Sequence, residues 1–254
     1  MSEDEAGPRL RLGVVPGVNP GRWADTWRGR HRDVPLDLLP LDAVRAEEAL
    51  LSGEVDAAFL RLPLRSPDLV RIPLWTEETV VAMSRESELT LLDSLAPTDL
   101  VGETLVVPVD DVLHWADAPG EPFAGLRPLT TADALDLVAH EAGVCVLPKA
   151  IARELHRRDV ELRPLVADAA SDDDAPAVPA SQIALAWLPL ETGEPAELVE
   201  QLIGIVRGRT VNSTRGKTPA PSASTGSQQQ RTPARTARPR LASARGRQPG
   251  RRKR

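Results

Sequence analysis

Residues 10–16 read Leu-Arg-Leu-Gly-Val-Val-Pro, a stretch that ends in consecutive apolar residues. Such a run is typical of a strand that is buried on both faces in a parallel sheet. Asn19 and Pro20 follow almost at once, and they suit a helix start with Asn as the cap and Pro at the first helical position. The segment therefore predicts a strand, a short loop and then a helix.

The same alternation continues along the chain. Residues 34–39 form the next expected strand, and Pro35 near its start favours the edge of a sheet because proline cannot donate to the ladder. Asp42 is placed to cap a helix over residues 43–52. A third apolar strand is expected over residues 55–60. This order begins a doubly wound α/β unit with strand order 2-1-3, in which the second strand lies at the edge.

The rest of the first 206 residues also alternates between strands and helices. Thr130 and Asp133 have the spacing of a capping box, which predicts a helix start. Pro148 opens a further helix, and residues 195–206 form the last one. Trp23 and Trp27 lie four residues apart, and we interpret them as core or interface residues rather than as a stacking platform. Further strands are expected at 69–74, 79–83, 105–109, 144–147 and 183–188.

Charge is strongly segregated along the chain. Residues 207–254 hold 14 of the 31 basic residues and none of the 37 acidic ones, which leaves 17 basic residues and a net charge of −20 before position 207. Large apolar residues are scarce after Val211. Such a composition does not bury enough surface to offset the entropy of ordering, so we predict a disordered basic tail. Residues 169–180, with three consecutive aspartates at 172–174, are expected to form an acidic loop.

Several classes of protein are excluded by what the sequence lacks. No apolar run reaches 18 residues, and the first seven residues are acidic and polar, so we expect a cytoplasmic protein without a membrane span. Cys145 is the only cysteine, and the four histidines never cluster at ligand spacing. We therefore expect no disulfide, no metal site and no cofactor. No catalytic motif is visible, which argues against an enzyme.

Two places favour binding of a small anion. Arg61 directly follows an apolar strand, and the carboxyl ends of parallel strands are where open α/β sheets bind ligands. Such an Arg can clamp a carboxylate in bidentate fashion, although an exposed Arg at a strand end is an equally good reading. In either case we expect Arg61 to be solvated when no ligand is bound. The helix starts after residues 16–19 and at Thr130 offer free backbone N–H groups, which attract anions.

Three passages resemble the effector-binding domain of LysR-type transcriptional regulators. Residues 10–16 look like its opening strand, and residues 50–59 (LLSGEVDAAF) are similar to its L-x-x-G-x-x-D-x-A passage. Residues 137–148 (LVAHEAGVCVLP) resemble its L-V-A-x-G-x-G-I-x-x-L-P signature. The resemblance covers residues 9–206. It implies a type 2 periplasmic-binding-protein-like α/β fold, in which two lobes, each with a small mostly parallel sheet, enclose an effector.

Carried over to this chain, the resemblance implies a first lobe of about 9–82 plus 163–206 and a second lobe of about 83–162. It also implies an effector site on both lobes, formed by Gly17, Val18, Asn19, Arg61, Thr76, Thr130 and Thr131. Family regulators carry an N-terminal helix-turn-helix, whereas about nine residues precede the first strand here, so we expect an orphan form without that element. The segment between Val109 and Thr130 is short and rich in proline, which predicts a reduced second lobe.

Two functions of different class follow. The first is a non-enzymatic binding module for a small carboxylated effector, linked to transcription regulation, with a homodimer left open. The second is a nucleic-acid-tethered accessory protein that acts through its basic tail, because such a tail binds phosphates without reading sequence. An enzyme on the same fold is a weaker third alternative. The tail cations expected to contact nucleic acid are Arg238, Arg240, Arg245, Arg247, Arg251, Arg252, Lys253 and Arg254.

Overall fold

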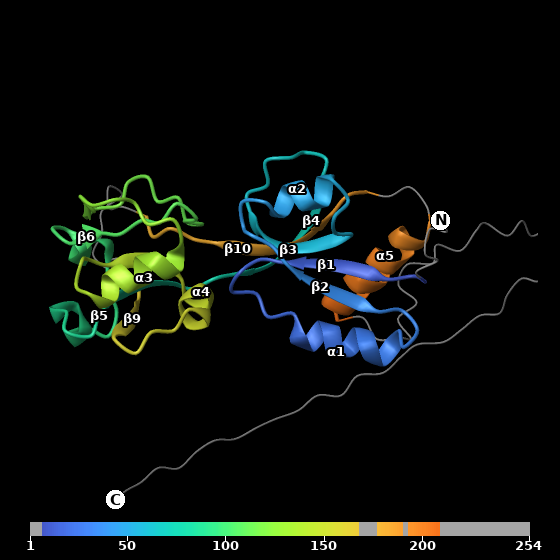
Figure 1. Cartoon of the computed structure of the whole chain (residues 1–254), viewed down its shortest axis with the longest axis horizontal. Coiled ribbons are helices and arrows are strands. Elements are labelled where there is room, and N and C mark those ends of the chain that lie inside the picture. The colour runs from blue at the N-terminus through green and yellow to red at the C-terminus, as the bar shows by residue number, and fades with distance from the viewer. Residues whose placement is uncertain (1–6, 168–176, 190–192, 209–254) are drawn as a thin grey trace, which may run out of the picture. The chain divides into compact units, whose positions relative to one another are not determined.

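The computed structural model describes residues 7–167, 177–189 and 193–208 (Figure 1). The eight tail cations named above, and most of the expected acidic loop, lie outside these residues. Two sheets organise the described part of the chain, one of five strands and one of three. The predicted α/β class with two lobes is confirmed. None of the described helices combines the length and the apolar character that crossing a membrane requires.

The first lobe is built on the five-stranded sheet. Its strand order is β2 (Leu36–Pro40), β1 (Leu10–Val14), β3 (Ala57–Leu62), β10 (Gln182–Trp187) and β4 (Val70–Thr76). Strand β1 pairs in parallel with both β2 and β3, whereas β10 is antiparallel to β3 and β4. The predicted order 2-1-3 is therefore confirmed, with β2 at an edge. Pro35 directly precedes β2, and its carbonyl accepts from the amide of Leu10.

Helices cover both faces of this sheet. Figure 1 shows α2 (Ala46–Leu51) on one side and α1 (Gly21–Arg30) with α5 (Glu194–Val206) on the other. Right-handed crossovers from β1 to β2 and from β2 to β3 place α1 and α2 on opposite faces. Both α1 and α2 begin later than the sequence predicted. Pro20 is the cap residue of α1, and Asn19 instead accepts from the amide of Gly21 at 2.9 Å. The cap residue of α2 is Arg45, not Asp42.

The two tryptophans of α1 belong to the core of the first lobe. The Trp23 ring stacks on Phe59 with a centroid distance of 4.8 Å. Trp27 is fully buried, and its indole N–H donates to the carbonyl of Val34 at 2.9 Å. These contacts confirm the core interpretation and tie α1 to β3 and to the chain before β2.

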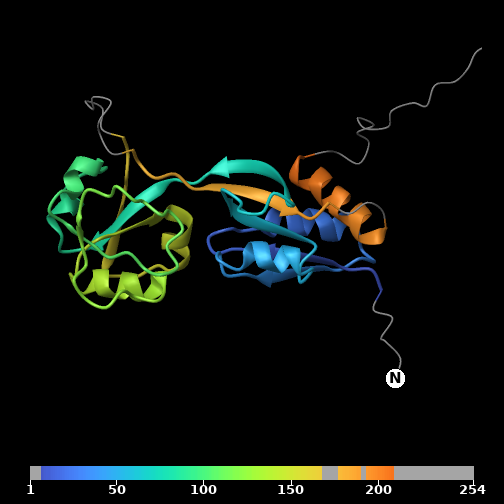
Figure 2. The same ribbon diagram turned by 90° about the horizontal axis from the view of Figure 1, so that it is seen from above.

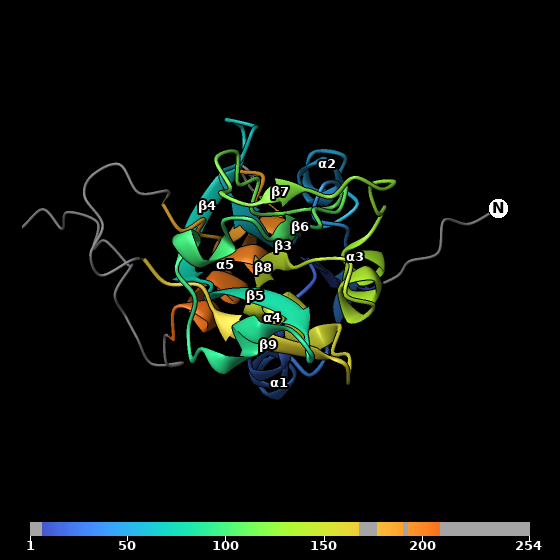
Figure 3. The ribbon, with the colours of Figure 1, turned by 90° about the vertical axis from the view of Figure 1, so that its left-hand side faces the viewer.

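The second lobe is built on the three-stranded sheet. Figure 3 shows β5 (Thr79–Ser84) between β8 (Cys145–Pro148) and β9 (Val160–Pro164). Both neighbours are antiparallel to β5, which corrects the expectation of a mostly parallel sheet in this lobe. Helix α3 (Thr131–Ala139) packs on the sheet, and α4 (Lys149–Glu154) follows β8 directly. Two single-turn helices, η1 (Glu88–Leu91) and η2 (Pro97–Leu100), follow β5.

The segment between β5 and β8 is less regular than expected. The predicted strand over residues 105–109 is reduced to β6 (Thr104–Leu105), which pairs with β7 (Glu121–Pro122). Pro108 lies in the missing part, and a residue without an N–H group cannot donate to a sheet ladder. By contrast, the predicted capping box is confirmed, because Thr130 and Asp133 each satisfy a backbone amide of the other.

The two sheets are joined by two stretches of chain. One leads from β4 to β5 through Glu77 and Glu78, and the other leads from β9 to β10. Figure 2 shows both crossings side by side between the lobes. Strand β4 of the first sheet ends at Thr76 and β5 of the second sheet begins at Thr79, so the chain changes sheets between these two residues.

Candidate functional site

The loops that follow β1 and β3 meet at the same edge of the first sheet. Arg61 lies near the end of β3, and its Nη2 donates to the carbonyl of Pro16, two residues after β1, at 2.8 Å. Parallel strands end on the same side of a sheet, so this convergence follows from the topology. It brings Arg61 together with the loop that holds Gly17 and Val18.

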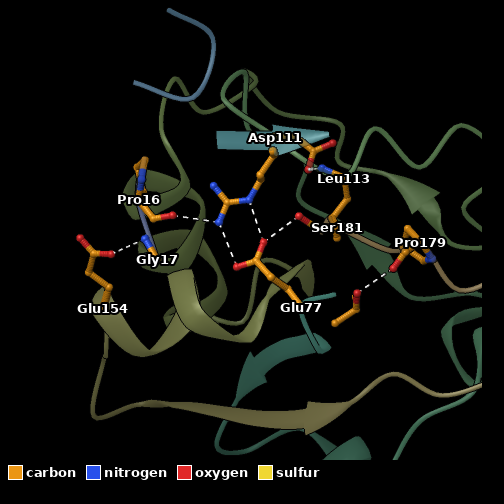
Figure 4. Close-up of polar contacts among 10 residues, drawn as sticks. Pro16, Gly17, Glu77, Asp111, Leu113, Glu154, Pro179 and Ser181 are labelled. Carbon is orange, nitrogen blue, oxygen red and sulfur yellow. Dashed lines mark hydrogen bonds and ion pairs between the residues drawn. The ribbon is translucent and has the colours of Figure 1, made fainter. Parts of the chain in front are cut away.

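Arg61 is not the solvated side chain that the sequence led us to expect. Its side chain is only 7% exposed, and that of its partner Glu77 is 3% exposed. The guanidinium meets the carboxylate at two points, Nε to Oε2 at 2.8 Å and Nη2 to Oε1 at 3.1 Å. The hydroxyl of Ser181 donates to the same Glu77 Oε2 at 2.7 Å. Figure 4 shows this network between Pro16, Glu77 and Ser181.

The network connects the carboxyl ends of β1 and β3 to both crossings. Glu77 lies in the crossing from β4 to β5, and Ser181 lies in the other crossing, directly before β10. The amide of Glu77 also donates to the carbonyl of Ser181 at 2.7 Å. One atom of the group stays unsatisfied: within the described part of the chain, the buried Nη1 of Arg61 has no hydrogen-bond partner.

A hollow of about 450 Å³ opens at the carboxyl ends of β1 and β2. We call it the β1–β2 pocket. Pro16, which accepts from Arg61, forms part of its wall, as does the predicted site residue Val18. Its apolar lining includes Val15, Leu38, Leu41 and Ala49, and its charged lining consists of Asp42, Arg45, Glu54 and Glu154. The pocket thus combines an apolar body with three carboxylates and one guanidinium.

Gly17 contacts the second lobe directly. Its amide donates to Oε2 of Glu154, the last residue of α4, at 2.6 Å. Gly17 has a φ of +83°, a conformation that glycine adopts without a steric cost. A Cβ built on Gly17 would lie 3.0 Å from Cγ1 of Ile151 and 3.2 Å from Cβ of Ala150. The loop after β1 and α4 are therefore closely packed.

The other expected site residues lie elsewhere. Asn19 folds its side chain back onto Gly21. Thr76 borders a separate hollow together with Arg71 and Gln182. The hydroxyl and amide of Thr130 bond to Oδ2 of Asp133, and the Thr131 hydroxyl donates to Oδ1 of Asp110 at 2.8 Å. The amide and hydroxyl of Thr130 are therefore already bonded within the capping box, and the carboxylate at this helix start is that of Asp133.

The described residues offer little for metal or nucleophilic chemistry. No group of three or more His, Cys, Asp or Glu side chains among them is placed to hold a metal ion. Burial raises the pKa of the Cys145 thiol to about 12, with smaller contributions from the charges of Asp111 and Asp110. Cys145 is therefore a small buried side chain rather than a reactive thiol.

Sequence reasoning missed Glu77, Ser181 and Glu154. The acidic pair at 77–78 was given no place in the site, because Glu side chains are mostly exposed. The sequence did hold a usable signal for Glu77. This acid comes soon after an expected strand, and Arg61, a possible partner, stands at the end of the strand before it. For Glu154 and Ser181 the sequence holds no comparable signal, because their partners are 137 and 104 residues away.

Known proteins resemble this chain in sequence and fold. The probable cat1 operon transcriptional activator of Acinetobacter lwoffii is 32% identical over 152 residues, covering 55% of this chain and 48% of the relative. The Hca operon transcriptional activator HcaR of Escherichia coli K12 is 25% identical over 218 residues, covering 82% and 67%. This chain therefore spans about half to two thirds of the length of these relatives.

A solved structure described as the BenM effector binding domain with its effector benzoate has the same fold. It superposes with a TM-score of 0.57 at 21% identity, covering 84% of this chain and 99% of that one. The family model described as LysR substrate binding domain matches residues 3–210. With a match over most of its length, the two sheets and the two crossings in place, this chain belongs to the LysR substrate-binding domain family.

Proposed function

We propose that this chain is a non-enzymatic, cytoplasmic binding module for a small carboxylated effector and that it acts in transcription regulation. The family and the names of the two relatives, both transcriptional activators, support a regulatory role. The β1–β2 pocket supplies an apolar body of a size suited to a small metabolite. The benzoate complex of the BenM domain supports a carboxylate as the anionic part of the ligand.

The observation on which this proposal rests is the unpartnered Nη1 of Arg61. A buried donor without an acceptor costs about 1–3 kcal/mol, and more when it is charged. Such a group needs a partner, and an ordered water or a bound ligand can supply it. An effector oxygen would satisfy Nη1 while Glu77 continues to hold the other two nitrogens. Nη1 is covered when no ligand is bound, so the loop after β1 must move before an effector reaches it.

Effector binding by the full chain is tested by thermal unfolding with a panel of small acids that includes benzoate. A ligand at about 100 times its Kd adds about 2.7 kcal/mol of stability. Arg61→Lys keeps the positive charge beside Glu77 but loses the guanidinium fork. We expect it to weaken binding of a stabilising acid by about 1.5–3 kcal/mol, whereas Arg28→Lys, in an exposed pair on α1, leaves binding unchanged. Equal affinity in Arg61→Lys contradicts this role.

A second function is favoured by the charge of residues 207–254, which hold 14 basic residues and no acidic one. In this alternative the chain is tethered to nucleic acid through these cations, among them Arg251, Arg252, Lys253 and Arg254. The two functions are compatible, since one uses the pocket and the other the tail. Loss of nucleic-acid binding on deletion of residues 207–254, with effector binding intact, separates them.

A further inference from the structure

Helix α4 makes hydrogen bonds at both of its ends to segments that lie outside the second sheet. At its start, the amide and the Nζ of Lys149 donate to the carbonyl and to Oε2 of Glu78, at 2.8 and 2.6 Å. At its end, Glu154 accepts from the amide of Gly17 in the first lobe. Figure 4 shows the Glu154 carboxylate pointing at Gly17. The helix thus links the crossing after β4 to the loop after β1.

The Gly17–Glu154 contact has the chemistry of ligand recognition. The amide of Gly17 is one of the donors at the carboxyl end of β1, where open α/β sheets receive anionic ligands. The side-chain carboxylate of Glu154, which is exposed to solvent, accepts from this amide at 2.6 Å, and an oxyanion that accepts from a backbone N–H is the arrangement by which carboxylate ligands are bound. Glu154 also lines the β1–β2 pocket. A side-chain carboxylate therefore already occupies a position suited to a ligand carboxylate.

We propose that Glu154 stands in for the effector carboxylate and thereby determines specificity. When no effector is bound, its carboxylate holds the amide of Gly17 and keeps α4 against the loop after β1. A ligand carboxylate competes for the same amide, and its arrival releases α4 from the first lobe. A neutral ligand of the same shape cannot replace the charge-assisted bond. This inference builds on the proposed effector site and adds the residue that selects for charge.

The close packing at Gly17 explains how a change at the Gly17–Glu154 contact would affect the position of α4. Ile151 and Ala150 of α4 lie against the place where a Cβ of Gly17 would be. As long as Glu154 holds the amide of Gly17, a shift of the loop is passed to α4, because closely packed groups transmit strain. The same movement would uncover Nη1 of Arg61, whose Nη2 is bonded to the neighbouring Pro16.

The contact between the lobes can be tested without any ligand. Spin labels at Gly29→Cys in α1 and Leu91→Cys in η1 report the distance between lobes in the full chain, and the buried Cys145 stays unlabelled. We expect Glu154→Ala to lengthen or broaden the distance distribution, and Glu154→Gln to do so to a smaller extent. Arg153→Ala, the adjacent exposed position on α4, is the matched control and leaves it unchanged. An unchanged distribution in Glu154→Ala overturns the proposal.

Specificity for charge is tested with benzoate and its neutral analogue benzamide. We expect Glu154→Ala to bind benzoate at least about tenfold more tightly than the unmodified chain, a gain of about 1.4 kcal/mol, with benzamide unaffected. Equal or weaker benzoate binding in Glu154→Ala overturns the role of Glu154 and leaves the effector site itself standing. If no acid of the panel binds either form while the label distance still increases, the carboxylated effector is wrong and the contact between lobes is supported.

Discussion

Arg61 and Glu77 form a two-point ion pair between the end of β3 and the crossing that leads from the first sheet to the second. Both side chains are almost completely buried. Ser181 adds a hydrogen bond to Glu77 from the other crossing. A single carboxylate therefore links the carboxyl end of β3 to both segments that join the two sheets.

Glu77→Ala should be strongly destabilising. It leaves the guanidinium of Arg61 buried without its counter-charge, and breaking a buried pair in this way costs about 3–5 kcal/mol. The loss is measured as the change in the free energy of unfolding in urea. Asp25→Ala, which breaks the exposed pair with Arg28, is the control and should cost at most about 1 kcal/mol. Similar losses in the two variants would contradict the buried character of the Arg61–Glu77 pair.

Gly17 and Gly53 form a matched pair for testing the packing of α4. Both have positive φ, +83° and +72°, so replacement by alanine carries a backbone cost of about 1–2 kcal/mol at either site. A Cβ at Gly53 meets nothing within 4 Å, whereas at Gly17 it would press on Ile151 and Ala150. We expect Gly17→Ala to lose about 1–3 kcal/mol more than Gly53→Ala, the usual cost of overpacking. Equal losses in urea unfolding would show that α4 is not held against this loop.

The first lobe was largely predictable because its pattern is local. The apolar run at residues 10–16 and the order of elements after it specify a parallel unit in which β1 lies between β2 and β3. The antiparallel second sheet was not predictable in the same way. The partners of β5, β8 and β9 are set by contacts between residues far apart in the sequence, such as Thr79 with Pro148.

The candidate site shows the same division. The convergence of the Pro16 loop and Arg61 follows from topology, and the sequence predicted it. The burial of the Arg61 side chain could not be predicted from the sequence. It depends on Glu77 and Ser181, which lie in the two crossings between the lobes. Thr130 was predicted correctly as a helix cap, and its hydroxyl and amide both bond to its capping partner Asp133, which the resemblance to the family did not take into account when it placed Thr130 in the effector site.

Cys145 should be unreactive in the folded chain. With its pKa raised to about 12, the thiol stays protonated at pH 8, and it is also buried. In the unfolded chain the pKa of this thiol is about 8.5. The unfolded state therefore loses its proton first, so the contribution of Cys145 to stability is complete below about pH 8.5 and is lost as the pH rises toward 12. Alkylation at pH 8 should be slow until urea unfolds the chain, and rapid at an exposed Leu91→Cys control. Rapid alkylation of Cys145 in the folded chain would contradict this.

Residues 207–254 should bind duplex DNA weakly and without sequence preference. If about half of the 14 cations contact phosphates, neutralising about seven of them gives a slope of roughly −6 in a plot of log binding constant against log salt concentration. The competing outcome is that the tail binds the preceding 206 residues, whose net charge of −20 makes them a strong internal partner. DNA retention is compared between the full chain and a chain ending at residue 206, over a series of salt concentrations. A full chain whose binding is insensitive to salt, or a truncated chain that binds equally well, would exclude the DNA function. Binding that appears only as salt weakens the attraction within the chain would instead favour the internal partner.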